Sequence, residues 1–327
     1  MSSSPILLEV QNLKKYFPVS GGFLKHKNKY IRAVDDISLT IEPGKTLGLV
    51  GESGCGKSTL GRAILHLEPP TSGNVFLEGR NIGLLSKKEM RLVRRDMQII
   101  FQDPFSSLNP RKTVAQIVRE PLDVHRVGTR SDRLNRVQYL LDMVGIRNNV
   151  LNRYPHEFSG GQRQRIGIAR AIALDPKFVV ADEPVSALDV SVQSQVLNLI
   201  AELQKSLNIG FLFISHDLAV VQHVSDFVAV MYLGKIVEQS NVRRIYSQPR
   251  HPYTKALLSA APATGITPRD SRSKLKGDLP SALESMIGCS FHTRCPLAEA
   301  RCRNESPEIR NVGGAEKHLI ACHLATE

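Results

Sequence analysis

The chain has 327 residues, of which 42% are hydrophobic, and its formal net charge is +12. That length is enough to bury a large core and to form two domains. No apolar stretch approaches the roughly 18 residues that span a bilayer. The opening MSSSPILLEVQNLKK lacks the basic and apolar regions of a signal peptide, so we expect a cytosolic protein. The positive charge would suit nucleic acid, a ribosome, an anionic membrane face or an ordinary solvated surface, and it does not choose among them.

The first chemical motif is GESGCGKSTL at residues 51–60, which fits the pattern G-x-x-x-x-G-K-[ST]. It follows the apolar run 47–50 and precedes the helical pattern 60–67, so a strand, a loop and a helix are expected in that order. Glycines allow successive N–H groups to point at phosphate oxygens, Lys57 can reach the β- and γ-phosphates, and Ser58 can bind magnesium. The candidate nucleotide-binding positions are Gly51, Ser53, Gly54, Gly56, Lys57, Ser58 and Thr59.

Along the rest of the chain, short apolar runs alternate with helical stretches. The runs lie at 45–50, 99–101, 178–181 and 211–214. They are too continuous for strands with one solvated face, and they predict a mostly parallel sheet covered on both faces. Residues 105–174 carry helical patterns with polar breaks, which predicts an inserted helical subdomain. The stretch VAVMYLGKIVEQ predicts two strands joined by a turn at Gly234, and after about residue 240 the composition shifts towards proline, charge and cysteine.

The stretch FSGGQRQR lies at residues 158–165, just before the helix-compatible run 166–174. It predicts a second helix N-terminus with a glycine-lined approach for an anion. Its candidate residues are Ser159, Gly160, Gly161 and Gln162. One nucleotide does not need two such elements on one chain, so we expect this element to serve the phosphates held by a second subunit, whose own copy serves this chain.

An acidic pair ends the apolar stretch FVVADE at residues 178–183. Asp182 is expected at the carboxyl edge of the sheet, where it can hold magnesium through water. Glu183 can point at the water that attacks the γ-phosphate, either as its general base or mainly by orienting it.

Together these motifs resemble those of the nucleotide-binding subunit of an ATP-binding cassette (ABC) transporter. FSGGQ resembles the family's signature motif, with Phe158 where leucine is commoner, and SALD at 186–189 resembles the D-loop. By this resemblance Gln102 in IIFQDP is the Q-loop glutamine, which acts at the magnesium and in catalysis. His216 in FISHD resembles the switch histidine, which senses and orients the γ-phosphate.

The fold that the resemblance implies is an α/β, P-loop NTPase ABC cassette. It has a mostly parallel sheet core with an antiparallel β part, an inserted helical subdomain at about 103–174, and a small cysteine-containing C-terminal extension. The ATPase domain is expected at 1–240 and the extension at 241–327. An aromatic ring near the N-terminus is expected to stack on adenine, and Phe17 is chosen over Tyr16 because of its place before the first core strands.

Three longer stretches narrow the resemblance to the ATPases of dipeptide and oligopeptide importers, most nearly the subunit labelled F of the dipeptide system. They are FQDPFSSLNPRKTV, DEPVSALDVSVQSQVLNLI and RHPYTKALLSAAP. The implied activity is ATP hydrolysis that powers di- or oligopeptide uptake, by a peripheral protein on the cytoplasmic face of the inner membrane. The implied partners are a second, non-identical ABC ATPase, two transmembrane permease subunits and an extracytoplasmic peptide-binding protein, and not nucleic acid.

Rival functions are a soluble ABC ATPase that acts on nucleic acid or the ribosome, and a regulatory metal-binding protein whose cassette has lost activity. Against the first, the chain has one nucleotide-binding unit and no long coiled-coil arm. Against the second, Lys57, Gln102, Asp182, Glu183 and His216 are all present. An importer for a nickel chelate or heme stays open, because the binding protein and permease select the cargo.

Four of the five cysteines lie close together near the C-terminus, at Cys289, Cys295, Cys302 and Cys322. In a cytosolic chain such a group is unlike a disulfide framework. Four thiolates can hold an iron-sulfur cluster or zinc, and His292, His318 or His323 could replace a thiolate at zinc. Some peptide-importer ATPases that the chain resembles here carry a [4Fe-4S] cluster, so that cofactor is expected, with zinc or free thiols as alternatives.

Overall fold

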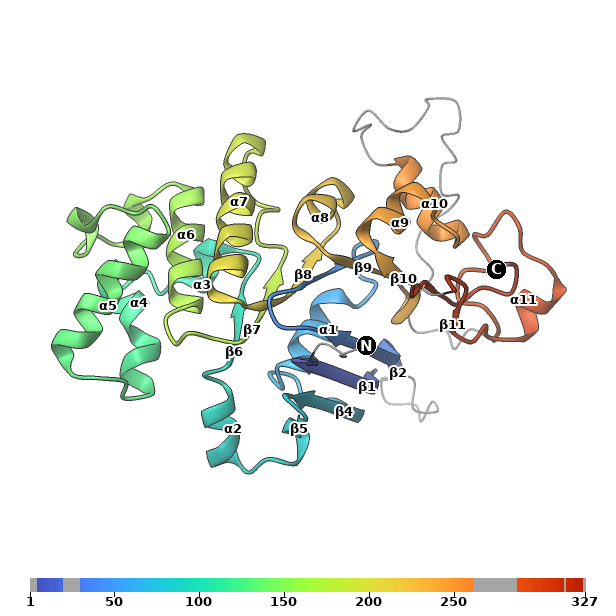
Figure 1. Ribbon diagram of the computed structural model, residues 1–327, viewed down its shortest axis with the longest axis horizontal. Coiled ribbons are helices and arrows are strands. Elements are labelled where there is room, and N and C mark those ends of the chain that lie inside the picture. Colours follow the sequence, from blue (N-terminus) through green and yellow to red (C-terminus); the bar gives the residue numbers. More distant parts are fainter. Residues whose placement is uncertain (1–4, 20–29, 261–286, 315, 326–327) are drawn as a thin grey trace. The chain divides into compact units, whose positions relative to one another are not determined.

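The computed structural model (Figure 1) describes residues 5–19, 30–260, 287–314 and 316–325. The chain divides into two compact units. The first unit comprises Met1–Leu8, Ile41–Thr46 and Leu77–Ile214; the second comprises Glu9–Thr40, Leu47–Phe76 and Ser215–Glu327. Of the predicted extension, residues 261–286, 315, 326 and 327 lie outside the described residues. Among the helices that the described part contains, none has the length and apolar character needed to cross a membrane.

The first unit is built around three parallel strands, β6 (Met97–Ile100), β7 (Phe178–Asp182) and β8 (Gly210–Ser215). Every residue of β7 and β8 is buried, which is the burial expected of parallel strands covered on both faces. Asp182 is the last residue of β7, so the acidic pair lies at the carboxyl end of this strand.

Helices α4 (Val114–Val124), α5 (Arg130–Met143) and α6 (Gly160–Ala171) pack against one another in this unit (Figure 1). Each begins at a hydroxyl side chain that accepts a hydrogen bond from the backbone of the first turn. The helical stretch predicted between 105 and 174 is therefore confirmed. The unit's other elements are β5 (Arg80–Asn81), η1 (Ile82–Leu84), α2 (Lys87–Val93), α3 (Pro104–Ser107), η2 (Asn148–Val150), η3 (Pro155–Glu157) and α7 (Val190–Leu207).

The second unit contains two groups of strands. One has the order β2-β1-β4, with β1 (Leu8–Pro18), β2 (Tyr30–Ile41) and β4 (Ser72–Leu77). The other has the order β11-β12-β10-β9-β3. Its strands are β3 (Thr46–Val50), β9 (Phe227–Tyr232), β10 (Lys235–Asn241), β11 (Arg310–Asn311) and β12 (Leu319–Ile320). β3 and β9 are parallel, whereas β9 and β10 form an antiparallel hairpin with a turn at Gly234, as predicted. The helices are α1 (Lys57–Ile64), α8 (Leu218–Val224), α9 (Val242–Ser247), α10 (Pro252–Ala260) and α11 (Ala300–Asn304).

A buried carboxylate on β10 joins this hairpin to the chain that follows it. Glu238 is fully buried and accepts hydrogen bonds from the backbone N–H groups of Arg250 and His251, at 2.8 and 3.0 Å. Its Oε1 also lies 2.7 Å from Nε2 of His318. The segments near residues 250 and 318 are thus tied to β10 through one side chain, which satisfies the rule that a buried charge must be paired.

Two local predictions need correction. The strand expected at 99–101 is β6, Met97–Ile100, and Phe101 is 37% exposed beyond its end. The helix expected from residue 166 begins at Gly160, because the Ser159 hydroxyl accepts a hydrogen bond from the Gln162 N–H and caps it there. The long strands β1 and β2 were not among the predicted apolar runs, although β2 ends in an alternating pattern in which Ile37, Leu39 and Ile41 are buried.

Candidate functional site

The phosphate loop, residues 51–58, connects β3 to α1 in the second unit. Gly56 is the N-cap of α1 with φ 106°, and a Cβ there would lie 1.9 Å from the carbonyl oxygen of Ala33. No other residue type fits that backbone and that approach. The strand, loop and helix order predicted from the motif is therefore confirmed, and α1 directs its N-terminal N–H groups at the loop.

Lys57 is held by the loop itself. Its side chain is buried, and Nζ donates to the carbonyl oxygens of Gly51 and Glu52 at 2.8 and 3.0 Å. Ser53 and Gly54 at the tip are exposed, whereas Ser58 and Thr59 in the first turn of α1 are half-buried. A curled backbone, a helix N-terminus and a lysine form a donor set that fits a polyphosphate.

The aromatic residues proposed for adenine stacking lie at the end of β1. The Tyr16 hydroxyl donates to the Asp35 carboxylate, and burial together with Asp35 raises the pKa of Tyr16 to about 12. Phe17 is half-buried, and the Lys15 ammonium lies 4.9 Å from its ring centroid. Tyr16 is thus engaged through its hydroxyl, whereas Phe17 contributes only a ring face.

In the first unit, the acidic pair meets the Q-loop glutamine. Gln102 Nε2 donates to Glu183 Oε2 at 3.0 Å, although the residues are 81 positions apart. Glu183 adopts φ 46°, and its N–H donates to the Ile214 carbonyl oxygen of β8. Asp182 is 3% exposed and Glu183 is half-buried. A carboxylate in a strained backbone conformation, held at a strand end with an amide partner, is suited to orienting water.

The signature residues form the first turn of α6 in the same unit. A Cβ on Gly161 would lie 2.3 Å from Cγ1 of Val192 on α7, so a glycine is needed for this close approach. Ser159 and Gln162 are exposed, and each side chain bonds the other residue's backbone in a capping box. The prediction of a glycine-lined helix N-terminus is confirmed, with Gly160 and Gly161 inside the helix and not before it.

A second set of contacts links the Q-loop segment to the signature helix. Arg163 of α6 lies 3.8 Å from the ring centroid of Phe105 on α3, and Arg170 of α6 donates to the carbonyl oxygen of Ser107. These two arginines connect the segment after Gln102 to α6 within the first unit.

His216 directly follows β8, as predicted, and its side chain is exposed. The next residue, Asp217, caps α8 through hydrogen bonds from its first-turn N–H groups. His216, Phe17 and the phosphate loop belong to the second unit, whereas Gln102, the acidic pair and the signature residues belong to the first.

The four C-terminal cysteines line one small pocket in the second unit, with a free volume of about 10 Å³. Its other lining residues are His251, Pro252, Phe291, His292, His323 and Leu324. Burial and the neighbouring cysteines raise the pKa of Cys289 to about 11, and burial raises that of Cys295. His318 instead bonds Glu238.

The pocket supplies the four thiols that the predicted [4Fe-4S] cluster needs, but they are not arranged as the ligands of a bound metal. In the described ranges, no three His, Cys, Asp or Glu side chains are arranged to hold a metal ion. The free volume is that of about one water molecule. A four-iron cluster would thus require the lining to open.

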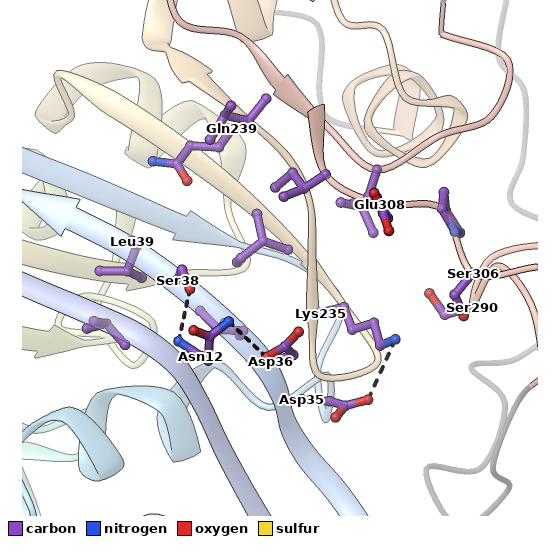
Figure 2. Close-up of a pocket in the computed structure, with 18 of the residues that line it drawn as sticks. Asn12, Asp35, Asp36, Ser38, Leu39, Lys235, Gln239, Ser290, Ser306 and Glu308 are labelled. Atoms are coloured by element: carbon purple, nitrogen blue, oxygen red, sulfur yellow. Dashed lines mark hydrogen bonds and ion pairs between the residues drawn. The ribbon is translucent and has the colours of Figure 1, made fainter. Parts of the chain in front are cut away.

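A larger groove of about 730 Å³ lies in the second unit between β1–β2 and the segments near β10 and residue 308 (Figure 2). Lys235 pairs with Asp35 at 3.6 Å, and Asn12 bonds Asp36 and Ser38. These polar groups therefore have hydrogen-bond or ion-pair partners within the groove lining.

Sequence reasoning missed one contact at the phosphate loop. Arg294, in the turn between Cys289 and Cys295, donates to both carboxylate oxygens of Glu52 at 2.7 and 3.0 Å. Glu52 N–H also donates to the Tyr253 hydroxyl at 2.9 Å. Residues some 200 positions apart leave no local pattern, so no sequence signal identified this pair.

Comparison with known proteins agrees with the phosphate loop and the other nucleotide-binding motifs described above. Residues 34–186 match the family "ABC transporter", and residues 237–302 match "Oligopeptide/dipeptide transporter, C-terminal region". The chain is 51% identical over 322 residues to "Oligopeptide transport ATP-binding protein AppF" of Bacillus subtilis (strain 168), covering 97% of each protein. It is 50% identical to "Probable peptide ABC transporter ATP-binding protein y4tS" of Sinorhizobium fredii (strain NBRC 101917 / NGR234), covering 98% of this chain and 90% of that protein.

Among solved structures, the chain resembles the dimeric ATP-binding cassette MJ0796 bound to ADP and Pi. The TM-score is 0.64 with 28% identity, covering 72% of this chain and 99% of that one. It also resembles cbiO1 of Clostridium perfringens, part of the transporter complex cbiONQ. That TM-score is 0.63 with 27% identity, covering 75% of this chain and 92% of that one.

Proposed function

Because this chain belongs to the family of ATP-binding subunits of oligopeptide and dipeptide ABC transporters, we propose that it hydrolyses ATP to power peptide uptake across the cytoplasmic membrane. The observation that carries this proposal is the likeness to an oligopeptide-transport ATPase along 97% of both chains. The phosphate loop also supports nucleotide binding, because Lys57 is buried and its Nζ donates to the carbonyl oxygens of Gly51 and Glu52.

In this proposal Phe17 stacks on adenine, and the residues that bind the ATP phosphates are Gly51, Ser53, Gly54, Gly56, Lys57, Ser58 and Thr59. Ser58, Gln102 and Asp182 hold magnesium, which when bound neutralises charge on the β- and γ-phosphates. The hydrogen bond from Gln102 to Glu183 supports a shared role for these two residues.

The remaining residue roles concern the water that attacks the γ-phosphate and the ATP bound by a second subunit. Glu183 orients the attacking water or accepts its proton, and His216 senses and orients the γ-phosphate. The signature residues, Ser159 to Gln162, act on the ATP of a second subunit. The likeness to a dimeric cassette bound to ADP and Pi supports that arrangement.

We assign the ATPase domain to residues 1–240, with its helical subdomain at about 103–174, and the extension to 241–327. The partners are a second, non-identical ATPase, two permease subunits and an extracytoplasmic peptide-binding protein. The protein acts peripherally at the cytoplasmic face of the inner membrane. The permease contacts the segment after Gln102, which is coupled to α6 through Arg163 and Arg170.

The same proposal assigns a [4Fe-4S] cluster to Cys289, Cys295, Cys302 and Cys322. Its support is that all four thiols line one pocket, and thiolates are the ligands of such clusters. Iron, sulfide and zinc analysis of anaerobically purified protein tests it. About four irons per chain are expected, zinc alone would change the metal, and no metal would leave free thiols.

The experiment on the ATPase uses Glu183→Gln in the complex with its co-purifying subunits. The variant should keep ATP binding and lose at least about 100-fold in turnover, because the carboxylate that acts on the water is gone. Glu202→Gln, an exposed change on α7 of the same unit, is the matched control. Hydrolysis by Glu183→Gln near the control's rate would overturn the catalytic assignment, and co-purification with ribosomes or nucleic acid in place of permeases would overturn the importer.

A further inference from the structure

Glu52, the second residue of the phosphate loop, is held from three sides. Lys57 Nζ donates to its carbonyl oxygen at 3.0 Å, and its N–H donates to the Tyr253 hydroxyl at 2.9 Å. Its carboxylate receives two hydrogen bonds from Arg294, at 2.7 and 3.0 Å. Two of these partners belong to the C-terminal segment, and the third is the lysine of the phosphate-binding motif.

The pair with Arg294 is well shielded. Only 6% of the Arg294 side chain and 24% of the Glu52 side chain are exposed, and the guanidinium also lies 5.9 Å from the ring centroid of Tyr232. A two-point guanidinium–carboxylate contact fixes orientation as well as charge. The loop conformation is thus set partly by a residue far outside the motif.

The charge of Glu52 explains why such a partner is needed. A carboxylate in a loop that binds a polyphosphate repels that ligand, and in a shielded site the repulsion is strong. Arg294 neutralises the carboxylate and keeps its oxygens occupied. Without the arginine, the carboxylate would either remain charged near the phosphates or turn back towards Lys57.

We propose that Arg294 is a positioning residue for ATP binding: it neutralises and orients Glu52, so that Lys57 and the loop N–H groups remain available to the phosphates. This inference rests on the proposed function of the loop. It also gives the C-terminal segment a role in nucleotide affinity, because Arg294 lies in the turn that joins two of the pocket cysteines.

A double-mutant cycle on the full-length chain tests this role. ATP affinity is measured by calorimetry in EDTA, where hydrolysis does not consume the ligand. Arg294→Met should weaken ATP binding about tenfold, a shift of about 1.4 kcal/mol, and less at high salt, since screening reduces the repulsion. Arg294→Met combined with Glu52→Gln should return to within about threefold of wild type, because the uncompensated charge is gone.

Two further variants separate positioning from simple stability. Arg294→Lys keeps the charge but loses the two-point contact, so an intermediate affinity is expected. Arg301→Met is the matched control: its arginine pairs with Glu305 on the same segment, and both side chains are 60% exposed. In the transporter complex, Arg294→Met should raise KM for ATP and leave kcat within about twofold.

The outcomes distinguish this inference from the function on which it rests. If wild type binds no ATP, or Lys57→Ala binds it as tightly as wild type, the proposed function fails and this inference with it. If wild type binds ATP and Arg294→Met binds equally well, only this inference fails. It also fails if the double variant binds as weakly as Arg294→Met alone, since a purely structural role predicts no rescue.

Discussion

The phosphate loop and the cysteine-lined pocket lie in the same unit, yet they differ in how far they are formed. In the loop, Gly56 packs against the Ala33 carbonyl and Lys57 is bonded to two loop carbonyls. In the pocket, four thiols line a volume of about 10 Å³, and among the described residues no three side chains there converge as ligands of a metal ion. A site made by backbone shape is complete before its ligand arrives, whereas a site made by converging donors depends on the ligand to organise them.

The largest expected difference between the cysteine-lined pocket and the phosphate loop is the effect of a cysteine substitution on bound metal. Cys302→Ser replaces a buried pocket thiol, and we expect it to remove most of the bound iron, because a cluster loses one of four ligands. Metal and sulfide analysis of anaerobically purified protein measures the loss. Cys55→Ser, in the phosphate loop, is the control and should leave the metal content unchanged. Unchanged iron and zinc in Cys302→Ser would contradict the ligand assignment.

The carboxylate that ties the C-terminal segments to β10 should have the next largest effect. Glu238→Gln leaves His318 without its buried carboxylate partner, and we expect the free energy of unfolding to fall by about 3 kcal/mol. Glu316→Gln, which removes an exposed partner of Arg244, is the control and should cost about 0.5 kcal/mol or less.

The pH dependence of unfolding tests the same group. Burial raises the pKa of Glu238, but hydrogen bonds from His318 and the backbone N–H groups outweigh burial and lower it below its usual 4.5. Its stabilisation is therefore present above pH 4.5 and is lost as pH falls through the lowered pKa. Denaturant titrations between pH 3 and 7 should show a smaller acid-induced loss in Glu238→Gln than in wild type. Equal pH profiles would contradict this account.

Two glycines test whether the loop is set by backbone shape. Gly56→Ala places a Cβ 1.9 Å from the Ala33 oxygen, and we expect a loss of about 2–3 kcal/mol in stability together with loss of ATP binding. At Gly54, φ is 81° but nothing lies within 4 Å of the added Cβ, so Gly54→Ala should cost only about 1 kcal/mol. Unfolding and ATP titrations of both variants measure the difference, and equal losses would show that packing against Ala33 does not matter.

The sequence predicted those features whose residues lie close together along the chain, and it missed contacts between residues far apart. The phosphate loop, the helix N-terminus near FSGGQ and the turn at Gly234 are local features, and residue type at fixed spacing was enough to predict them, although not the Ser159 cap that starts α6 at Gly160. The position of the four cysteines around one pocket was also expected, because four cysteines close together near the C-terminus suggested that they bind one metal cofactor. The ion pair between Glu52 and Arg294 spans 242 positions, and neither residue stands out from the other charged residues of the chain.

The smallest effect should come from the second C-terminal contact with the loop. Tyr253→Phe removes the hydroxyl that accepts the Glu52 N–H but keeps the ring, which packs against Tyr232 and Phe291. Losing one hydrogen bond to a partly shielded N–H should weaken ATP binding about threefold, less than the loss of Arg294. The matched control is Tyr246→Phe, whose hydroxyl donates to the Leu218 carbonyl oxygen. If Tyr253→Phe weakened binding more than Arg294→Met, holding the Glu52 backbone would matter more than neutralising its charge, and the balance between the two contacts would be reversed.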